Sequence, residues 1–256
     1  MQSVFDSNAF NQNLFFPRHD SSPPPATSEE IYVEVEPNIK VHLRRYPNEE
    51  AHCSLLYFHG NGEIVSDYNH FEQLYTAIGL ELIVCDYRGY GKSDGSPTLR
   101  NVLQDSHIIY KYLKENEKFN GRVGVMGRSL GSAPAIELCV HYPELEFCII
   151  ESGYADPVPL VERRGIKVDG ITEEDNALFN NSVKIAKVQC PLLIMHGDED
   201  FLISSKEAKL NYNQAGSEMK YLEILKGVGH NDMLMAPENG YFNALYEFIR
   251  ALPKKG

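Results

Sequence analysis

A serine stands between two glycines where an apolar run gives way to a small-residue helical pattern. The stretch RVGVMGRSLGSAPAIELCV covers residues 122–140, and Ser129 is the centre of its GRSLG pentapeptide. The flanks predict a strand followed by a helix, and a sharp turn between them strains the serine backbone. Glycine two residues to either side avoids collisions with the neighbouring backbone. Such a turn presents the hydroxyl at the sheet edge, beside unpaired N–H groups of the helix start. The pattern favours a nucleophile, and a simple helix N-cap is the alternative.

A serine hydroxyl attacks at neutral pH when a base removes its proton and a carboxylate orients that base. Of the nine histidines, His230 is best placed, because it lies in KGVGHNDM between the last predicted strand and the last predicted helix. His196 ends the preceding strand and is expected to pack or bond locally. The acid is expected on the loop after that strand. The segment CPLLIMHGDEDFLIS supplies three carboxylates there, those of Asp198, Glu199 and Asp200.

Apolar runs that alternate with helical patterns predict the elements that carry these residues. Two alternating segments predict half-buried antiparallel edge strands at 31–36 and 40–46. Short apolar runs predict mostly parallel, doubly covered strands at 53–58, 80–87, 122–127, 146–152 and 190–197, with a last strand at 219–225. Helical patterns cover 63–79, 96–116, 129–142, 204–216 and 239–253. This order predicts an α/β fold with a doubly wound, mostly parallel sheet of about eight strands and helices on both faces. Ligands bind such sheets beyond the C-terminal strand ends.

Two segments interrupt this alternation. Residues 1–30 contain FNQNLFFPR and HDSSPPPATSEE, and they predict an N-terminal arm with a Pro-rich linker, Phe15 and Phe16 docking on the domain. The main domain is expected over residues 31–256. Within it, the connection at about 154–187 is longer than a crossover needs. We expect a small lid over the strand ends with at most two short helices, and an ordinary crossover helix with ragged ends is the alternative.

Composition narrows the classes of partner. The 256 residues include 24 Lys and Arg and 36 Asp and Glu, which gives a formal net charge of −12. This sign opposes binding to nucleic acid and to anionic membrane surfaces. The N-terminus lacks a signal peptide pattern and the apolar runs are too short to span a membrane, so a cytoplasmic protein without membrane insertion is expected. The five cysteines, odd in number and without CxxC spacing, are expected to be reduced core thiols. We expect a small-molecule substrate and neither a metal nor another cofactor.

Five motifs, in this order along the chain, resemble the α/β-hydrolase superfamily. They are HGNGEIVSDY (59–68), CDYRGYGKSDG (85–95), MGRSLGSAPA (126–135), CPLLIMHGDEDFLI (190–203) and GVGHND (227–232). The most similar branch contains monoacylglycerol lipase-like, serine aminopeptidase-like and small esterase-like enzymes. The resemblance runs from about residue 31 to the C-terminus and implies the α/β-hydrolase fold with a short lid insertion.

The resemblance implies a catalytic triad. It makes Ser129 the nucleophile and His230 the general base. In the HG-x-x-D pattern of this family the acid is the third residue after the glycine, which is Asp200 here. Asp198 is its main rival. The chain order of serine, aspartate and histidine is that of α/β-hydrolases.

The resemblance also implies an oxyanion hole. Its donors are the backbone N–H groups of Asn61, which follows HG, and of Leu130, which follows the nucleophile. One such donor contributes about 3 kcal/mol to transition-state stabilisation. The role needs no side chain at Asn61. Arg128 departs from the pattern, because many relatives carry an aromatic residue or histidine there, and we expect it to form a structural ion pair with a nearby carboxylate.

These features predict a serine hydrolase that cleaves a carboxylic ester or a related acyl compound through an acyl-enzyme. A thioesterase and an aminopeptidase are alternatives within the fold, and the acidic residues of 154–187 are possible ligands for a substrate ammonium group. The charged lid and the absence of tryptophan weigh against an interfacial lipase. A non-catalytic binding protein is the alternative outside the enzymes. Acyl-chain length, leaving group and oligomeric state stay open.

Overall fold

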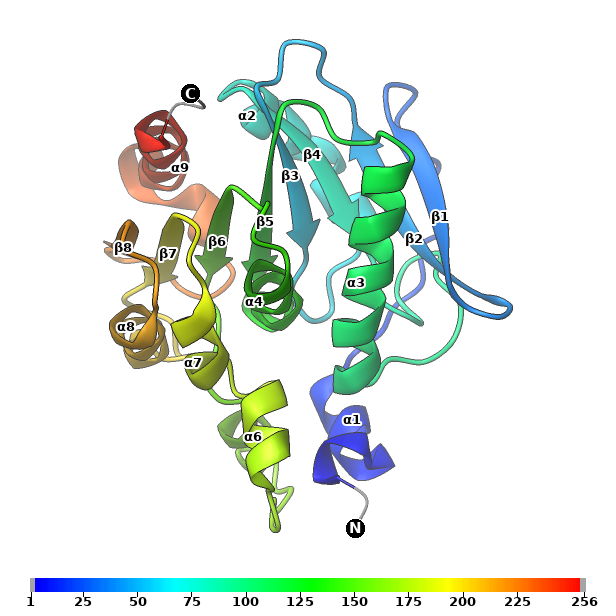
Figure 1. Ribbon diagram of the computed structural model, residues 1–256, viewed down its shortest axis with the longest axis vertical. Coiled ribbons are helices and arrows are strands. Elements are labelled where there is room, and N and C mark those ends of the chain that lie inside the picture. The colour runs from blue at the N-terminus through cyan, green and yellow to red at the C-terminus, as the bar shows by residue number, and fades with distance from the viewer. Residues whose placement is uncertain (1–2, 254–256) are drawn as a thin grey trace.

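The computed structural model describes residues 3–253, and within them eight strands form one sheet (Figure 1). Their order across the sheet is β1-β2-β4-β3-β5-β6-β7-β8. The pairs β1–β2 and β2–β4 are antiparallel, and the other neighbours are parallel. The strands are β1 (Glu29–Glu36), β2 (Ile39–Tyr46), β3 (Cys53–Phe58), β4 (Leu80–Cys85), β5 (Arg122–Arg128), β6 (Phe147–Glu151), β7 (Leu192–Gly197) and β8 (Lys220–Leu225). The predicted doubly wound, mostly parallel sheet is confirmed.

Helices cover both faces of the sheet. The α-helices are α1 (Asn8–Leu14), α2 (Glu72–Thr76), α3 (Leu99–Glu115), α4 (Ser132–His141), α5 (Val158–Glu162), α6 (Glu173–Phe179), α7 (Asn181–Lys184), α8 (Ser205–Gln214) and α9 (Gly240–Ala251). Helices α3, α4 and α8 pack in the hydrophobic cluster of one face, and α2 and α9 pack in that of the other. The arrowheads of the central strands point toward the end of the molecule where α1 and α6 lie (Figure 1).

The core follows from the alternation of side chains along buried strands. In β3, Leu56 and Phe58 belong to the cluster under α3 and α4, whereas Leu55 and Tyr57 belong to the cluster under α2 and α9. All six residues of β3 are buried. A central strand covered on both faces therefore needs a continuous apolar sequence, which is the pattern that the chain shows.

The N-terminal segment joins this core. Phe5, Phe10, Leu14 and Phe15 are buried in the same hydrophobic cluster as α3 and α4, while Phe16 is 49% exposed. Helix α1 was not expected from the sequence. It begins at Asn8 because the hydroxyl of the N-cap Ser7 accepts a hydrogen bond from Phe10 N. The division of the chain at residue 30 stays a prediction.

Two predicted elements have a different form. The helical pattern of 63–79 gives a 3₁₀ helix at Val65–His70 and the short α2, which meet at Phe71, and Asp67 caps the start of the 3₁₀ helix by accepting the backbone N–H of Ile64. The connection at 154–187 contains three short helices, α5, α6 and α7, plus a 3₁₀ turn at Ile185–Lys187, rather than at most two. Among residues 3–253, no helix is both long enough and apolar enough to cross a membrane.

Candidate active site

The turn between β5 and α4 holds Ser129 in a left-handed conformation, with φ of 51°. A Cβ added at Gly127 would lie 2.1 Å from the carbonyl oxygen of Gly131, and one added at Gly131 would lie 2.0 Å from that of Phe58. Both contacts are with backbone atoms, which cannot move away without distorting the turn, so neither position can carry a side chain. The predicted steric reason for the two glycines is confirmed, and the serine is held at the C-terminal end of a central strand.

His230 lies on the loop after β8 and faces the serine. Its Nε2 is 3.0 Å from the Oγ of Ser129, and its Nδ1 is 2.7 Å from Oδ2 of Asp200. The three side chains come from the loops after β5, β7 and β8, and all three residues are buried. One imidazole therefore links a hydroxyl to a carboxylate, the arrangement in which an imidazole can accept the hydroxyl proton.

Asp200 is fixed by four hydrogen-bonding groups. Its Oδ1 accepts the backbone N–H groups of Leu202 at 2.9 Å and Ile203 at 2.8 Å. Its Oδ2 lies 3.1 Å from Nε2 of His196, besides its contact with His230. Burial favours the neutral acid, but these hydrogen bonds outweigh it and hold the pKa of Asp200 well below its ordinary value. The carboxylate is thus charged and oriented at neutral pH.

Asp198, the rival acid, lies elsewhere. Its side chain is exposed, and its Oδ1 accepts the backbone N–H of Gly227 at 2.7 Å. This bond joins the loops after β7 and β8 but does not reach the imidazole of His230. His196 bonds locally as expected, with its Nε2 2.7 Å from the carbonyl oxygen of Ile203.

The loop after β3 brings Asn61 to the serine. Asn61 and Leu130 both line the small pocket at Ser129, where the sequence places the oxyanion donors. The Asn61 side chain has a separate task. Its Oδ1 accepts from the backbone N–H of Phe16 at 2.9 Å, and its Nδ2 donates to the carbonyl oxygen of Leu14. This side chain therefore anchors the N-terminal arm beside the serine.

The pocket at Ser129 has a volume of about 40 Å³. Five lining residues were not singled out from the sequence, namely Leu14 of the arm, Leu160 and Arg164 of the 154–187 connection, and Leu202 and Ile203 of the loop after β7. The Arg164 guanidinium donates to the carbonyl oxygen of Asn13 and lies 4.6 Å from the ring centre of Phe16. The arm and the connection therefore meet over the serine. No local pattern marks these residues, because tertiary contacts alone place them there.

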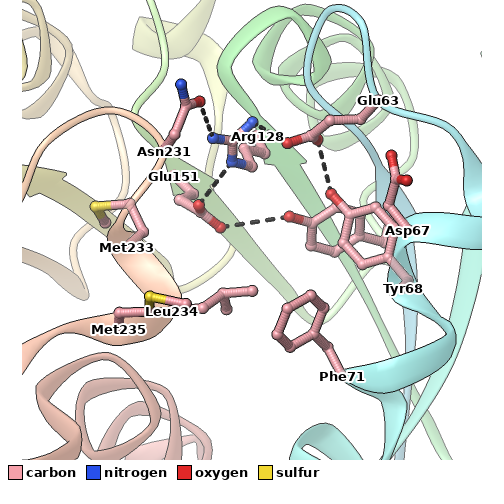
Figure 2. Close-up of a pocket in the computed structure, with 11 residues that line it drawn as sticks. Glu63, Asp67, Tyr68, Phe71, Arg128, Glu151, Asn231, Met233, Leu234 and Met235 are labelled. Atoms are coloured by element: carbon pink, nitrogen blue, oxygen red, sulfur yellow. Dashed lines mark hydrogen bonds and ion pairs between the residues drawn. The ribbon is translucent and has the colours of Figure 1, made fainter.

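A second pocket, of about 220 Å³, lies beside the side chain of Arg128 (Figure 2). Arg128 forms the expected ion pair with a carboxylate, its Nε lying 3.0 Å from Oε1 of Glu151. It also pairs with Glu63, which the sequence did not single out. Neither partner could be identified from the chain alone, because Glu151 ends β6 and Glu63 follows β3, both distant from Arg128 in the sequence.

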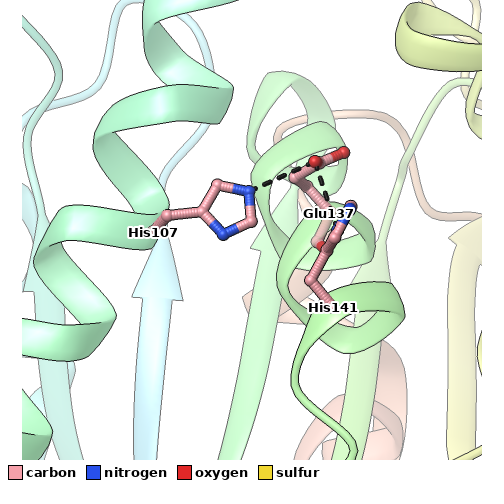
Figure 3. Close-up of side chains that lie close together, drawn as sticks. All are labelled: His107, Glu137 and His141. Atoms are coloured by element: carbon pink, nitrogen blue, oxygen red, sulfur yellow. Dashed lines mark hydrogen bonds and ion pairs between the residues drawn. The ribbon is translucent and has the colours of Figure 1, made fainter.

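One group of side chains offers metal-ligand atoms. His107 of α3 and Glu137 and His141 of α4 have ligand atoms within 4.8 Å of one another (Figure 3). The Oε1 of Glu137 lies 3.2 Å from Nε2 of His107, but its Oε2 accepts from the buried Lys184 at 2.7 Å. This ammonium already balances the carboxylate charge and would repel a cation. We therefore interpret the group as an ion-pair network that joins α3, α4 and α7.

Comparisons with known proteins agree with this architecture. A family model described as serine aminopeptidase, S33, matches residues 49–159. The chain is 27% identical to protein bem46 of Schizosaccharomyces pombe over 229 residues, which cover 85% of this chain and 75% of that protein. It is 25% identical to lysophosphatidylserine lipase ABHD12 of Danio rerio, with 79% of this chain and 59% of that protein covered.

Solved structures share the fold. The Pyrococcus furiosus esterase Pf2001 superposes with a TM-score of 0.75 at 19% identity, covering 92% of this chain and 98% of that one. A monoacylglycerol lipase of Paleococcus ferrophilus gives a TM-score of 0.63 at 17% identity, with 82% and 98% covered. The relatives support a hydrolase. The strand order and these matches together show that the chain has the α/β-hydrolase fold, and its sequence is similar to that of serine aminopeptidase-like proteins and α/β-hydrolase domain proteins.

Proposed function

We propose that the protein is a serine hydrolase that cleaves carboxylic esters with small acyl groups. The observation that carries this proposal is the continuous contact from Ser129 through His230 to Asp200, at 3.0 Å and 2.7 Å. Both are hydrogen-bonding distances, so His230 can accept the Oγ proton of Ser129 while Asp200 orients the imidazole. A non-catalytic binding protein would not require this geometry at the end of three separate strands.

The reaction has two steps. His230 accepts the Oγ proton as Ser129 attacks the ester carbonyl, and backbone N–H groups of Asn61 and Leu130 stabilise the oxyanion. His230 then gives that proton to the leaving alcohol, and the acyl group stays on Ser129. In the second step His230 accepts a proton from water as the water oxygen attacks the acyl carbonyl. His230 then returns this proton to Oγ of Ser129 as the acyl–Oγ bond breaks, which releases the carboxylic acid and restores the free serine. The charged Asp200 stabilises the imidazolium that forms in both steps.

The pocket dimensions indicate the acyl class. About 40 Å³ beside Ser129, walled by Leu14, Leu160 and Leu202, accommodates a few heavy atoms rather than a long chain. Apolar walls suit a short alkyl group. None of the described residues that line this pocket carries a carboxylate, and Arg164 is among them. This favours an ester over the free amino group that an aminopeptidase binds.

A labelling experiment tests the proposal. We expect a fluorophosphonate to modify Ser129 in the folded protein, and p-nitrophenyl acetate to be hydrolysed faster than p-nitrophenyl octanoate. The Ser129→Ala variant should lose both labelling and hydrolysis. Ser205→Ala, at the start of α8, is the matched control and should retain both. Undiminished hydrolysis by folded Ser129→Ala would refute the proposal.

A further inference from the structure

The side chain of Arg128 binds four residues from three other segments of the chain. Its Nη2 donates to the carbonyl oxygen of His230 at 2.8 Å and to Oδ1 of Asn231 at 3.0 Å. Its Nε donates to Glu151 at the end of β6, and its Nη1 donates to Glu63 of the loop after β3. Figure 2 shows the guanidinium between Glu63, Glu151 and Asn231. Arg128 itself directly precedes the proposed nucleophile, so one side chain connects the loops that carry the nucleophile, the base and the proposed oxyanion donor.

The two carboxylates are themselves held in place. The second oxygen of Glu63 accepts the backbone N–H of Gly60 at 2.6 Å and the hydroxyl of Tyr68 at 2.9 Å. That of Glu151 accepts the hydroxyl of Tyr241 at 2.8 Å. Glu63 is therefore fixed to the residue that precedes Asn61. The cluster cannot shift at one loop without breaking a bond at another.

Charge balance accounts for only part of this arrangement. Burial disfavours the guanidinium charge, but the carboxylates of Glu63 and Glu151 outweigh it and raise the pKa of Arg128. Burial also opposes the charged form of Glu63, but Arg128 outweighs it and lowers the pKa of Glu63. The lowered pKa of Glu63 keeps one carboxylate charged to offset the one positive charge, whereas burial raises the pKa of Glu151. The additional bond to the neutral carbonyl of His230 therefore fixes a position rather than balancing a charge.

The surroundings of the His230 loop explain why such a bond is needed. The residues that follow His230 border the pocket of about 220 Å³ on one side, where Met235 is exposed, while Met233 is buried in the core on the other. Asn231 is exposed. A loop that lacks packing on one side keeps a single conformation only when directed bonds hold its backbone.

We propose that Arg128 is a positioning residue, whose guanidinium holds the backbone of His230 where the imidazole reaches Ser129, while Glu63 and Glu151 hold the guanidinium. This proposal rests on the proposed serine hydrolase function. The fork of the guanidinium reaches several acceptors at fixed angles, and an ammonium in its place does not. A displacement of about 1 Å in a catalytic group costs roughly 100-fold in rate.

The test compares Arg128→Lys with Arg44→Lys. Arg44 is also fully buried and paired, with its Nε 2.6 Å from Glu30, but it lies on β2, separated from β5 by two strands. Each variant is labelled to completion with a fluorophosphonate, so that kcat for p-nitrophenyl acetate is expressed per labelled site. We expect Arg128→Lys to lower kcat per labelled site roughly 10- to 100-fold with little change in KM, and Arg44→Lys to lower only the number of labelled sites.

Asn231→Ala keeps the test decisive if Arg128→Lys does not fold. This exposed side chain contributes one acceptor to the guanidinium, so its loss should lower kcat per labelled site by about threefold to tenfold without reducing the labelled fraction. Unchanged kcat per labelled site in the folded variants would overturn the positioning role, as would an equal loss in Arg44→Lys. Activity that survives Ser129→Ala would instead refute the proposed function.

Discussion

The Oγ of Ser129 lies 3.0 Å from Nε2 of His230, although 101 residues separate them in the chain. The contact forms because β5 and β8 both end at the same edge of the sheet. Ser129 is 7% exposed and His230 is 9% exposed, so little water competes for the hydrogen bond. A substrate carbonyl must therefore reach the serine through the pocket between the arm and the 154–187 connection.

Exchange of Asp200 for asparagine should remove most of the activity. The carboxylate binds Nδ1 of His230 at 2.7 Å, and an amide cannot stabilise the imidazolium that forms during proton transfer. We expect kcat for p-nitrophenyl acetate to fall roughly 10³- to 10⁴-fold in Asp200→Asn. Asp198→Asn is the control, because its oxygen binds Gly227 N and not the imidazole. If Asp198→Asn were the variant that lost activity, the assignment of the acid would be wrong.

The sheet and the candidate triad could be predicted because their signals are local. Strands covered on both faces show continuous apolar runs, and the turn at Ser129 requires glycines two residues to either side. His230 then follows from the rule that parallel strands bring their C-terminal ends to one edge. The same rule leaves Asp198, Glu199 and Asp200 as candidate acids, and the resemblance to α/β-hydrolases selects Asp200.

The walls of the pocket could not be predicted in this way. Leu14 reaches Ser129 because Asn61, 47 residues away in the chain, binds its carbonyl oxygen. Asn11, one turn earlier, accepts the backbone N–H of Leu99 at a separation of 88 residues. Such bonds join polar residues that carry no periodicity of their own. The partners of Arg128 escaped prediction for the same reason.

Alanine at Gly127 should disrupt the nucleophile turn. Its Cβ would lie 2.1 Å from the carbonyl oxygen of Gly131, a backbone atom that cannot move independently of the turn. We expect the free energy of unfolding to fall by at least about 2 kcal/mol and fluorophosphonate labelling of Ser129 to be lost. Gly240→Ala is the control, since its Cβ would meet only a side chain, at 3.3 Å. Urea denaturation and labelling measure both effects. A fully labelled Gly127→Ala protein would contradict the steric argument.

Shortening Leu14 should admit longer acyl groups. Leu14 is buried and lines the pocket of about 40 Å³ at Ser129, so its replacement by alanine removes three carbon atoms from one wall. We expect the ratio of kcat/KM for p-nitrophenyl butyrate to that for the acetate to rise roughly tenfold in Leu14→Ala. Leu74→Ala, at an exposed position on α2, should leave this ratio unchanged. An unchanged ratio in both variants would show that the arm does not limit the acyl chain.

The network around Glu137 should make stability depend on pH. Burial favours the neutral acid, but hydrogen bonds from His107 (Figure 3) and from Lys184 outweigh it and lower the pKa of Glu137 from 4.5 to about 2. A carboxyl group whose pKa is lower in the folded than in the unfolded protein stabilises the fold at every pH above its unfolded-state pKa. This contribution is lost as the pH falls from that value toward about 2. The lowered pKa corresponds to a contribution on the order of 3 kcal/mol at neutral pH.

Urea denaturation of the wild type and Glu137→Gln between pH 7 and pH 3 measures this contribution. Glutamine keeps the shape of the side chain but leaves the buried Lys184 without an anionic partner, so the variant should be the less stable protein at pH 7. The difference should stay constant down to about pH 4.5 and shrink below it, because the wild-type carboxylate then takes up protons in the unfolded state first. Glu247→Gln removes an exposed carboxylate paired with Arg250 and should show no such trend. If the difference in stability between the two proteins instead grew as the pH fell, Glu137 would be protonated in the folded protein. Lys184 would then not keep the carboxyl group of Glu137 charged.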